Sequence, residues 1–193
     1  MGGDTLRRMH DVPGNPYRAL LNKFAVQVGK LQLSCNGMSI AASRVLGLRM
    51  PSLRHLHIWN AHPVVESQNF PMLQALILTF SKPAVPTPLP HVTRLHYFGP
   101  FDDLWDDGAR IISQLPHLQH LTFKLGGRRI QWDTGRHILL PSLISLEVKW
   151  LGPTDANAIL FVLNLLSLPE LQTIVLHDNY EREGYTTLFQ SLV

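Results

Sequence analysis

One short phrase occurs six times in the sequence, and this repetition constrains the fold more than any other feature. Each copy has a proline, one variable residue and then an apolar frame close to Leu-x-x-Leu-x-Leu. Successive prolines are 19 to 28 residues apart, which is the length of one small supersecondary unit. A seventh copy, without proline, begins at Val28. The six prolines are Pro51, Pro71, Pro90, Pro116, Pro141 and Pro169.

The second half of each phrase predicts a short β-strand. Side chains two residues apart in a strand lie on the same face, so the last two apolar residues of every phrase should point into one interior. A single unit cannot bury its apolar face alone, and we therefore expect the copies to stack around a shared core. The proline ahead of each strand lacks an amide donor and favours extended geometry in the residue before it. The predicted core pairs are Leu56 and Ile58, Leu76 and Leu78, Leu95 and Tyr97, Leu121 and Phe123, Leu146 and Val148, and Ile174 and Leu176.

The segments between the predicted strands differ in kind. Apolar residues at helical spacing predict helices over residues 37–46, 102–114, 154–166 and 183–192. Residues 81–89 hold three prolines and should form an extended loop. The two shortest periods thus lack a helix and the two longest contain one, which predicts an α/β fold. We divide the chain into an N-terminal flanking segment, residues 1–27, and a repeat domain of about seven units, residues 28–193.

From Val28 to about Asn179, the Pro-x-Leu-x-x-Leu-x-Leu phrase at variable period resembles the leucine-rich repeat region of F-box proteins, particularly the fungal ones. The resemblance implies an α/β leucine-rich repeat solenoid, with parallel strands on a concave face and irregular helices and loops on a convex face. In that family an F-box docks on the adaptor of a cullin-RING ubiquitin ligase, and the repeat region captures the protein to be ubiquitinated. No F-box is visible before Val28, so we expect adaptor binding only from a longer form that has one. The Asn or Cys that the family places after each strand is matched by Asn36 and Asn179, while Ser81, Pro100, Gly126 and Leu151 stand in that position elsewhere.

The residues that alternate with the core positions should line the opposite face of the sheet, which is the usual binding surface in such repeats. They include five of the ten histidines, four lysines or arginines, two aromatic residues and one acid, Glu147. This pattern predicts a protein partner with an acidic or phosphorylated surface, whereas the alternative is that histidine is a tolerable polar filler on an exposed sheet. If the imidazoles have ordinary pKa values, they should gain charge together near pH 6.5 and strengthen such binding. The predicted contact residues are His55, His57, Trp59, Arg94, His96, Phe98, His120, Lys124 and Lys149.

Composition and motifs argue against several other classes of protein. Hydrophobic residues make up 45% of the chain and charged residues 16%, so a sizeable core is available. A net charge of +3 without a basic cluster is weak for nucleic-acid binding. The single cysteine, Cys35, excludes an intramolecular disulfide and a multi-thiolate zinc site. No apolar stretch reaches the roughly 18 residues that a membrane span needs, and no signal-like segment is visible, so we expect a cytoplasmic or nuclear protein.

The sequence also lacks the patterns that usually carry catalysis. It has no Gly-x-Ser-x-Gly elbow, no phosphate-binding glycine-rich loop that ends in Lys and Ser or Thr, and no His-Glu-x-x-His helix. We therefore expect no enzymatic activity, no cofactor and no metal, and interpret the chain as a module for protein–protein interaction. Its predicted role is substrate recognition in an F-box-type ubiquitin ligase. A leucine-rich repeat scaffold or receptor-like binding protein without any link to ubiquitin is the alternative.

Overall fold

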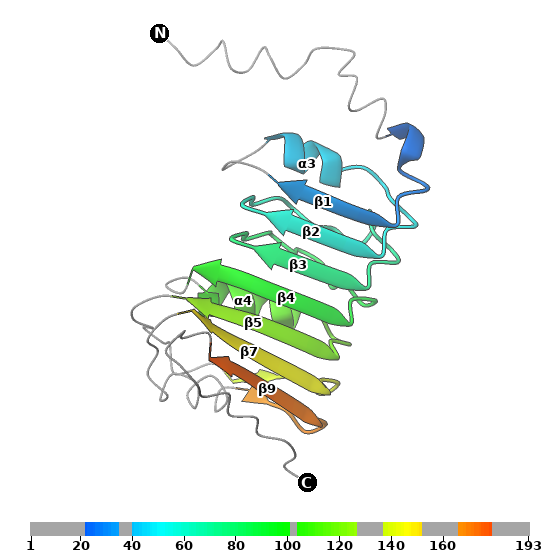
Figure 1. Ribbon diagram of the computed structural model, residues 1–193. Helices are drawn as coiled ribbons and strands as arrows, with labels where there is room; N and C mark the ends of the chain where they lie inside the picture. Colours follow the sequence, from blue (N-terminus) through cyan, green and yellow to red (C-terminus); the bar gives the residue numbers. More distant parts are fainter. Residues whose placement is uncertain (1–21, 35–39, 101–103, 127–136, 152–165, 179–193) are drawn as a thin grey trace.

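The computed structural model describes residues 22–34, 40–100, 104–126, 137–151 and 166–178. These residues form an α/β structure in which a seven-stranded parallel sheet keeps its strands in chain order (Figure 1). None of the helices in these ranges is long and apolar enough to cross a membrane. The sheet contains β1 (Lys30–Ser34), β2 (His55–Trp59), β3 (Ala75–Thr79), β4 (Arg94–Pro100), β5 (His120–Gly126), β7 (Ser145–Leu151) and β9 (Thr173–Asp178).

The proline phrases all fold into the same turn. In the first, the amide of Leu53 donates to the carbonyl of Met50, the residue before Pro51. The equivalent hydrogen bond closes all six phrases, at 3.1 to 3.3 Å between nitrogen and oxygen. Each proline thus occupies the second position of a β-turn, where its fixed φ angle is already suitable. The turn delivers the chain directly into the next strand.

A second repeated contact sets the register between neighbouring strands. The amides of Gln74 and Ala75 both donate to the carbonyl of Arg54, each at 2.9 Å. The same sharing of one carbonyl by two successive amides occurs at all six junctions of the seven-stranded sheet. Because every strand enters in the same way, equivalent residues pair: Leu76 lies beside Leu56 on one side and beside Leu95 on the other.

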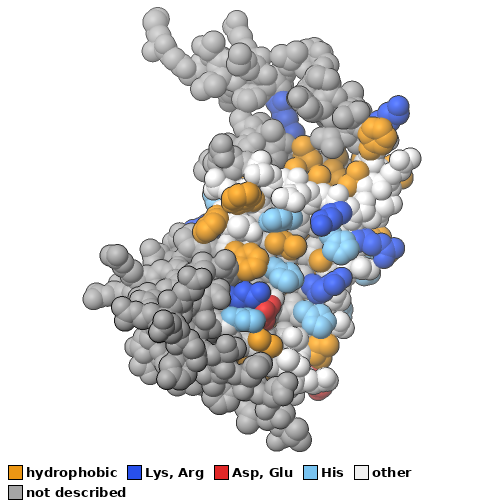
Figure 2. Space-filling view, viewed as in Figure 1, with side chains coloured by type: hydrophobic (Ala, Val, Ile, Leu, Met, Phe, Trp, Pro, Cys, Tyr) orange, Lys and Arg blue, Asp and Glu red, His pale blue; other side chains and the backbone are white. Residues whose placement is uncertain are grey.

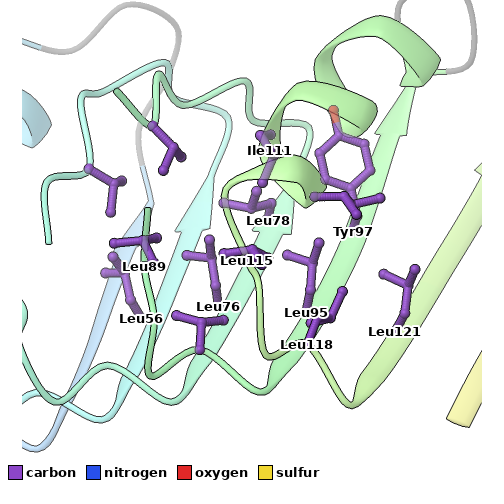
Figure 3. Close-up of a cluster of buried hydrophobic side chains, with 14 of the residues drawn as sticks. Leu56, Leu76, Leu78, Leu89, Leu95, Tyr97, Ile111, Leu115, Leu118 and Leu121 are labelled. Carbon is purple, nitrogen blue, oxygen red and sulfur yellow. The ribbon is translucent and has the colours of Figure 1, made fainter. Parts of the chain in front are cut away.

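The predicted core is confirmed. Ten of the twelve predicted core side chains are at most 2% exposed, while those of Ile174 and Leu176 in β9 are partly buried. Figure 3 shows leucines of successive strands side by side, with Ile111 next to Leu78. Ile111 belongs to α4 (Leu104–Ser113), which lies behind the sheet in Figure 1. The face of the sheet that carries these side chains is therefore buried in the core.

The predicted connections are confirmed where the structure describes them, with one correction. The helix α3 (Ile40–Leu46) and the helix α4 match the predictions for 37–46 and 102–114. Residues 81–89 form no helix or strand, apart from an isolated bridge between Ala84 and Val64. The predicted helix over 183–192 and residues 154–165 of the helix predicted over 154–166 lie outside the described residues.

The correction concerns the end of that predicted helix at Leu166. Leu166 and Ser167 form the strand β8 (Leu166–Ser167), which pairs in parallel with β6 (Ile138–Leu139). The helical prediction was wrong here because backbone pairing with β6 requires an extended conformation at Leu166 and Ser167, and Pro169 favours the same conformation at Leu168. The carbonyl of Ser167 instead accepts the amide of Leu140 at 3.0 Å, and this contact also needs an extended backbone.

Ser81 ties two neighbouring units together behind the sheet. Its side chain is buried, and its hydroxyl accepts the amide of Ala61 at 3.3 Å. The same hydroxyl lies 3.0 Å from the carbonyl oxygen of Ile58 and 2.9 Å from that of Thr79, to one of which it donates its proton. Ser81 therefore satisfies buried backbone groups of both units. It stands in the position that the resemblance assigns to Asn or Cys.

Candidate binding face

The residues opposite the core form three straight columns across the seven-stranded sheet, which we call the open face. The register of the parallel pairs aligns equivalent residues from β1 to β9, as the sequence predicts. All nine predicted contact residues occupy these columns, although for Lys124 the structure describes the strand position alone. The columns are Lys30, His55, Ala75, Arg94, His120, Ser145 and Thr173; Gln32, His57, Ile77, His96, Thr122, Glu147 and Val175; and Ser34, Trp59, Thr79, Phe98, Lys124, Lys149 and His177.

The open face combines positive charge, imidazoles and aromatic surface. In β2 the burial alternates, with His55 and His57 half-buried and Trp59 exposed, because their neighbours Leu56 and Ile58 point into the core. Figure 2 looks onto this face and shows histidines and basic side chains spread over it, with little acidic colour among them. The electrostatic balance of the face is thus positive.

Glu147 is the one acid of the three columns, and it is surrounded by donors. Its Oε1 atom lies 3.0 Å from Nζ of Lys149 and 2.7 Å from Nε2 of His177, while Oε2 accepts the hydroxyl of Thr122 at 3.0 Å. Burial by itself would raise the pKa of Glu147, but the hydrogen bonds from Lys149, Thr122 and His177, with the charge of Lys149, lower it overall. The carboxylate is therefore ionised near neutral pH and is already engaged by three donors.

Two histidines near the middle of the face are hard to protonate. The pKa of His57 is lowered by burial and by the charge of Lys30. The pKa of His96 is lowered by burial and by the charges of Lys149, Arg94 and His120, against an opposing effect of Glu147. The expectation that all five imidazoles gain charge together near pH 6.5 is therefore wrong for these two residues, which charge only at lower pH.

When their imidazoles are neutral, His57 and His96 act through hydrogen bonding and ring contacts rather than through charge. Nε2 of His57 lies 3.1 Å from Oγ1 of Thr79 on the neighbouring strand. The His96 ring lies beside that of Phe98, with their centroids 6.4 Å apart and the planes tilted by 35°. Both contacts fix side chains that face solvent, so this part of the surface is preorganised.

The sequence analysis overlooked Phe80, which follows β3 directly and is 51% exposed. Its backbone adopts a positive φ of 50°, as does that of Asn60, at 53°, in the equivalent position after β2. The amide of Asn60 donates to the carbonyl of Thr79, and the amide of Phe80 donates to that of Phe98. The sequence does carry a clue: Phe80 stands where the preceding unit has Asn60, and Asn is common at positive φ whereas Phe is not.

The described residues do not assemble a metal site. No group of three or more His, Cys, Asp or Glu side chains within them is placed to hold a metal ion. The histidines of β2, β4 and β5 therefore lack, within the part of the chain that the structure covers, the further ligands that a metal site needs.

Comparison of this chain with known protein families, curated proteins and solved structures finds no match. Any functional conclusion therefore rests on the residues themselves.

Proposed function

We propose that this chain is a leucine-rich repeat solenoid whose open face binds another protein, without catalysis. The repeated turn, the repeated strand entry and the shared core support the repeat architecture. The alignment of polar, basic and aromatic side chains into columns on a solvent-facing parallel sheet carries the functional proposal. Such columns offer one broad surface on which neighbouring units contribute to a common interface.

The partner in this proposal has an acidic surface. Lys30, Arg94 and Lys149 supply permanent positive charge, and Trp59 supplies an exposed aromatic anchor. Aromatic and arginine side chains are the residues that most often dominate the energy of protein interfaces. The partner recognised in this way is a protein rather than a nucleic acid, because the positive residues are dispersed among imidazoles and apolar groups.

The biological context that we propose is substrate recognition in an F-box-type ubiquitin ligase. It rests on the resemblance of the proline-led phrases to those of that family, and it requires an F-box in a longer form of the protein. The second candidate, a scaffold or receptor-like repeat protein, shares the same open face and differs only in lacking ligase subunits among its partners. The two are separated by which proteins accompany the chain in cells.

Affinity purification with mass spectrometry tests both levels of the proposal. The double variant Trp59→Ala, Phe98→Ala should lose the protein partner that the unmodified chain retains, because both side chains belong to the third column. The matched control is Met72→Ala, Leu139→Ala, which removes two exposed apolar side chains that lie outside the columns. Equal recovery of every partner by all three proteins would refute the assignment of the open face. Cullin and adaptor subunits recovered with the natural full-length product would support the ligase context, and their absence would favour the scaffold.

A further inference from the structure

We propose that the open face recognises a polypeptide segment that presents one acidic side chain and one bulky apolar side chain about 13 Å apart, the length of four strand residues. The acidic group binds at Arg94 and His120, and the apolar group binds at an aromatic cluster formed by Trp59, Phe80 and Phe98. This inference rests on the proposed function and deepens it by specifying the chemistry of the partner.

We assign the acidic side chain of the ligand to the first residues of β4 and β5, Arg94 and His120. Arg94 and His120 are register partners on adjacent strands, and both are exposed. Neighbouring strands lie about 4.8 Å apart, so both side chains can reach one carboxylate. Neither side chain forms an ion pair with any residue in the described ranges. The first column therefore holds a cation that is available to a partner.

The remaining charges of the face reinforce this choice. Lys149 already contacts Glu147 at 3.0 Å, so it offers less to an incoming anion than Arg94 does. Glu147 is itself engaged by three donors, and the columns contain no second acid that a basic partner could contact. Toward β1 the first column continues with Ala75, the half-buried His55 and Lys30, none of which carries a negative charge. The charge complementarity is thus one-sided and selects an acidic segment.

The apolar side chain is assigned to the opposite ends of the strands. Trp59, Thr79 and Phe98 follow one another across β2, β3 and β4 in the third column. Phe80 lies at the same end of the sheet, because its amide donates to the carbonyl of Phe98. Trp59 is 46% exposed and Phe80 is 51% exposed, values that are high for large aromatic residues. Clustered exposed aromatic surface of this kind is typical of an interaction site.

The backbone at Phe80 supports a binding role for its ring. A positive φ is unfavourable for a bulky side chain, and Asn60 shows that the same turn forms with a residue type that tolerates it. The fold therefore gives no reason for an aromatic residue here. Local strain that the fold does not require is characteristic of functional positions.

The separation between the two subsites follows from β4. Arg94 and Phe98 are both on this strand and both on the open face, four residues apart. At about 3.3 Å per residue this places their Cα atoms roughly 13 Å apart. An extended ligand spans that distance with an acid and an apolar residue at positions i and i+4, whereas a helical ligand needs eight or nine residues at about 1.5 Å each.

Peptide selection on the purified full chain tests the inference. A library of random twelve-residue peptides is panned on the unmodified protein, and the recovered peptides are synthesised for affinity measurement. We expect enrichment of Asp or Glu four residues from a Trp, Phe or Leu, or eight to nine residues away in helical sequences. Arg94→Glu should weaken the binding of these peptides by about tenfold or more, because it removes a charge-assisted hydrogen bond and adds repulsion. Replacing the peptide's acid with Lys should restore part of the affinity for that variant.

Two further variants separate binding from folding. Phe80→Asn copies the residue found in the preceding unit, so it should leave the unfolding midpoint unchanged or raise it while weakening peptide binding several-fold. Arg49→Glu makes the same charge reversal at an exposed position outside the sheet and should leave binding unchanged. Arg94→Gln provides the milder change if Arg94→Glu reduces the folded population.

The outcomes distinguish this inference from the proposed function. Peptides that require Trp59 and Phe98 but show no acidic preference, and that bind Arg94→Glu as well as the unmodified chain, would overturn the inference and leave the open face as a binding surface. Selected peptides that bind all these variants with equal affinity would overturn both.

Discussion

Replacing Ser81 with alanine should weaken the packing between the first and second proline-led units, which Ser81 connects through Ala61. The hydroxyl is the acceptor for the amide of Ala61, and both residues are 1% exposed, so water cannot take its place without local opening. A buried donor left without a partner costs about 1 to 3 kcal/mol, and we expect a loss near 2 kcal/mol for Ser81→Ala. The substitution removes a single oxygen atom and creates little cavity, so this figure reflects the hydrogen bonds.

The matched control is Ser67→Ala. Ser67 also contacts a residue 20 positions later, Thr87, with 3.2 Å between the two hydroxyl oxygens, but this pair is exposed. Water can replace it, so the loss should stay below about 0.5 kcal/mol. The two variants share the mutation and the sequence separation of the contact, so their difference reports the buried hydrogen bonds of Ser81 against the exposed one of Ser67.

Urea denaturation followed by circular dichroism measures the difference. With a denaturant dependence of about 2 kcal/mol per molar urea, Ser81→Ala should lower the midpoint by about 1 M and Ser67→Ala by no more than about 0.25 M. A change in the slope for Ser81→Ala would instead indicate that unfolding is no longer two-state. Equal midpoints for the two variants would refute the idea that the buried hydroxyl holds neighbouring units together.

Three further outcomes are expected. Leu76→Ala removes a side chain with no exposure and should cost about 2 to 5 kcal/mol in thermal unfolding, whereas Ile77→Ala, on the open face of the same strand, should cost less than about 1 kcal/mol. Because the pKa of His96 in the folded chain is lowered from 6.5, the unfolded chain binds more protons than the folded one as the pH drops through that value. The free energy of unfolding should therefore decrease as the pH is lowered. The loss between about pH 7 and about pH 5 should be smaller in His96→Gln, as measured by denaturant titration at each pH. Pro90→Ala should lower the urea midpoint by the equivalent of about 0.4 to 1 kcal/mol, mainly by loosening the unfolded chain, with an unchanged native spectrum.

The core and the columns were predictable because alternation is a strong signal once a phrase repeats. A one-residue slip would turn Leu56 and Ile58 outward, so the apolar pattern permits a single register. The β-turn at Pro51 also has a local sequence signal, since proline is favoured at the second position of such turns. On the sequence alone, we use this proline only to predict where a strand begins. At the turn and in the strand that follows it, the conformation that the local sequence favours is the one that strand pairing requires.

The properties of individual side chains on the open face were not predictable in the same way. The donors around Glu147 come from three strands, and their convergence depends on side-chain conformations that no local pattern encodes. The lowered pKa of His96 likewise arises from partial burial between neighbours. At Leu166 the apolar spacing predicts a helix, but long-range pairing with β6 determines the local structure.

The sharing of one carbonyl by two amides has a consequence for how such a chain can change in length. An incoming strand meets its neighbour through that backbone contact, the parallel ladder and two core side chains, and the backbone contact is supplied alike at Gly29, Arg54, Gln74 and the later junctions. Duplication or excision of a whole phrase would therefore present matching edges on both sides of the splice. Each duplication would widen the solvent-facing surface by about 4.8 Å, so a longer ligand could be accommodated without any redesign of the interior.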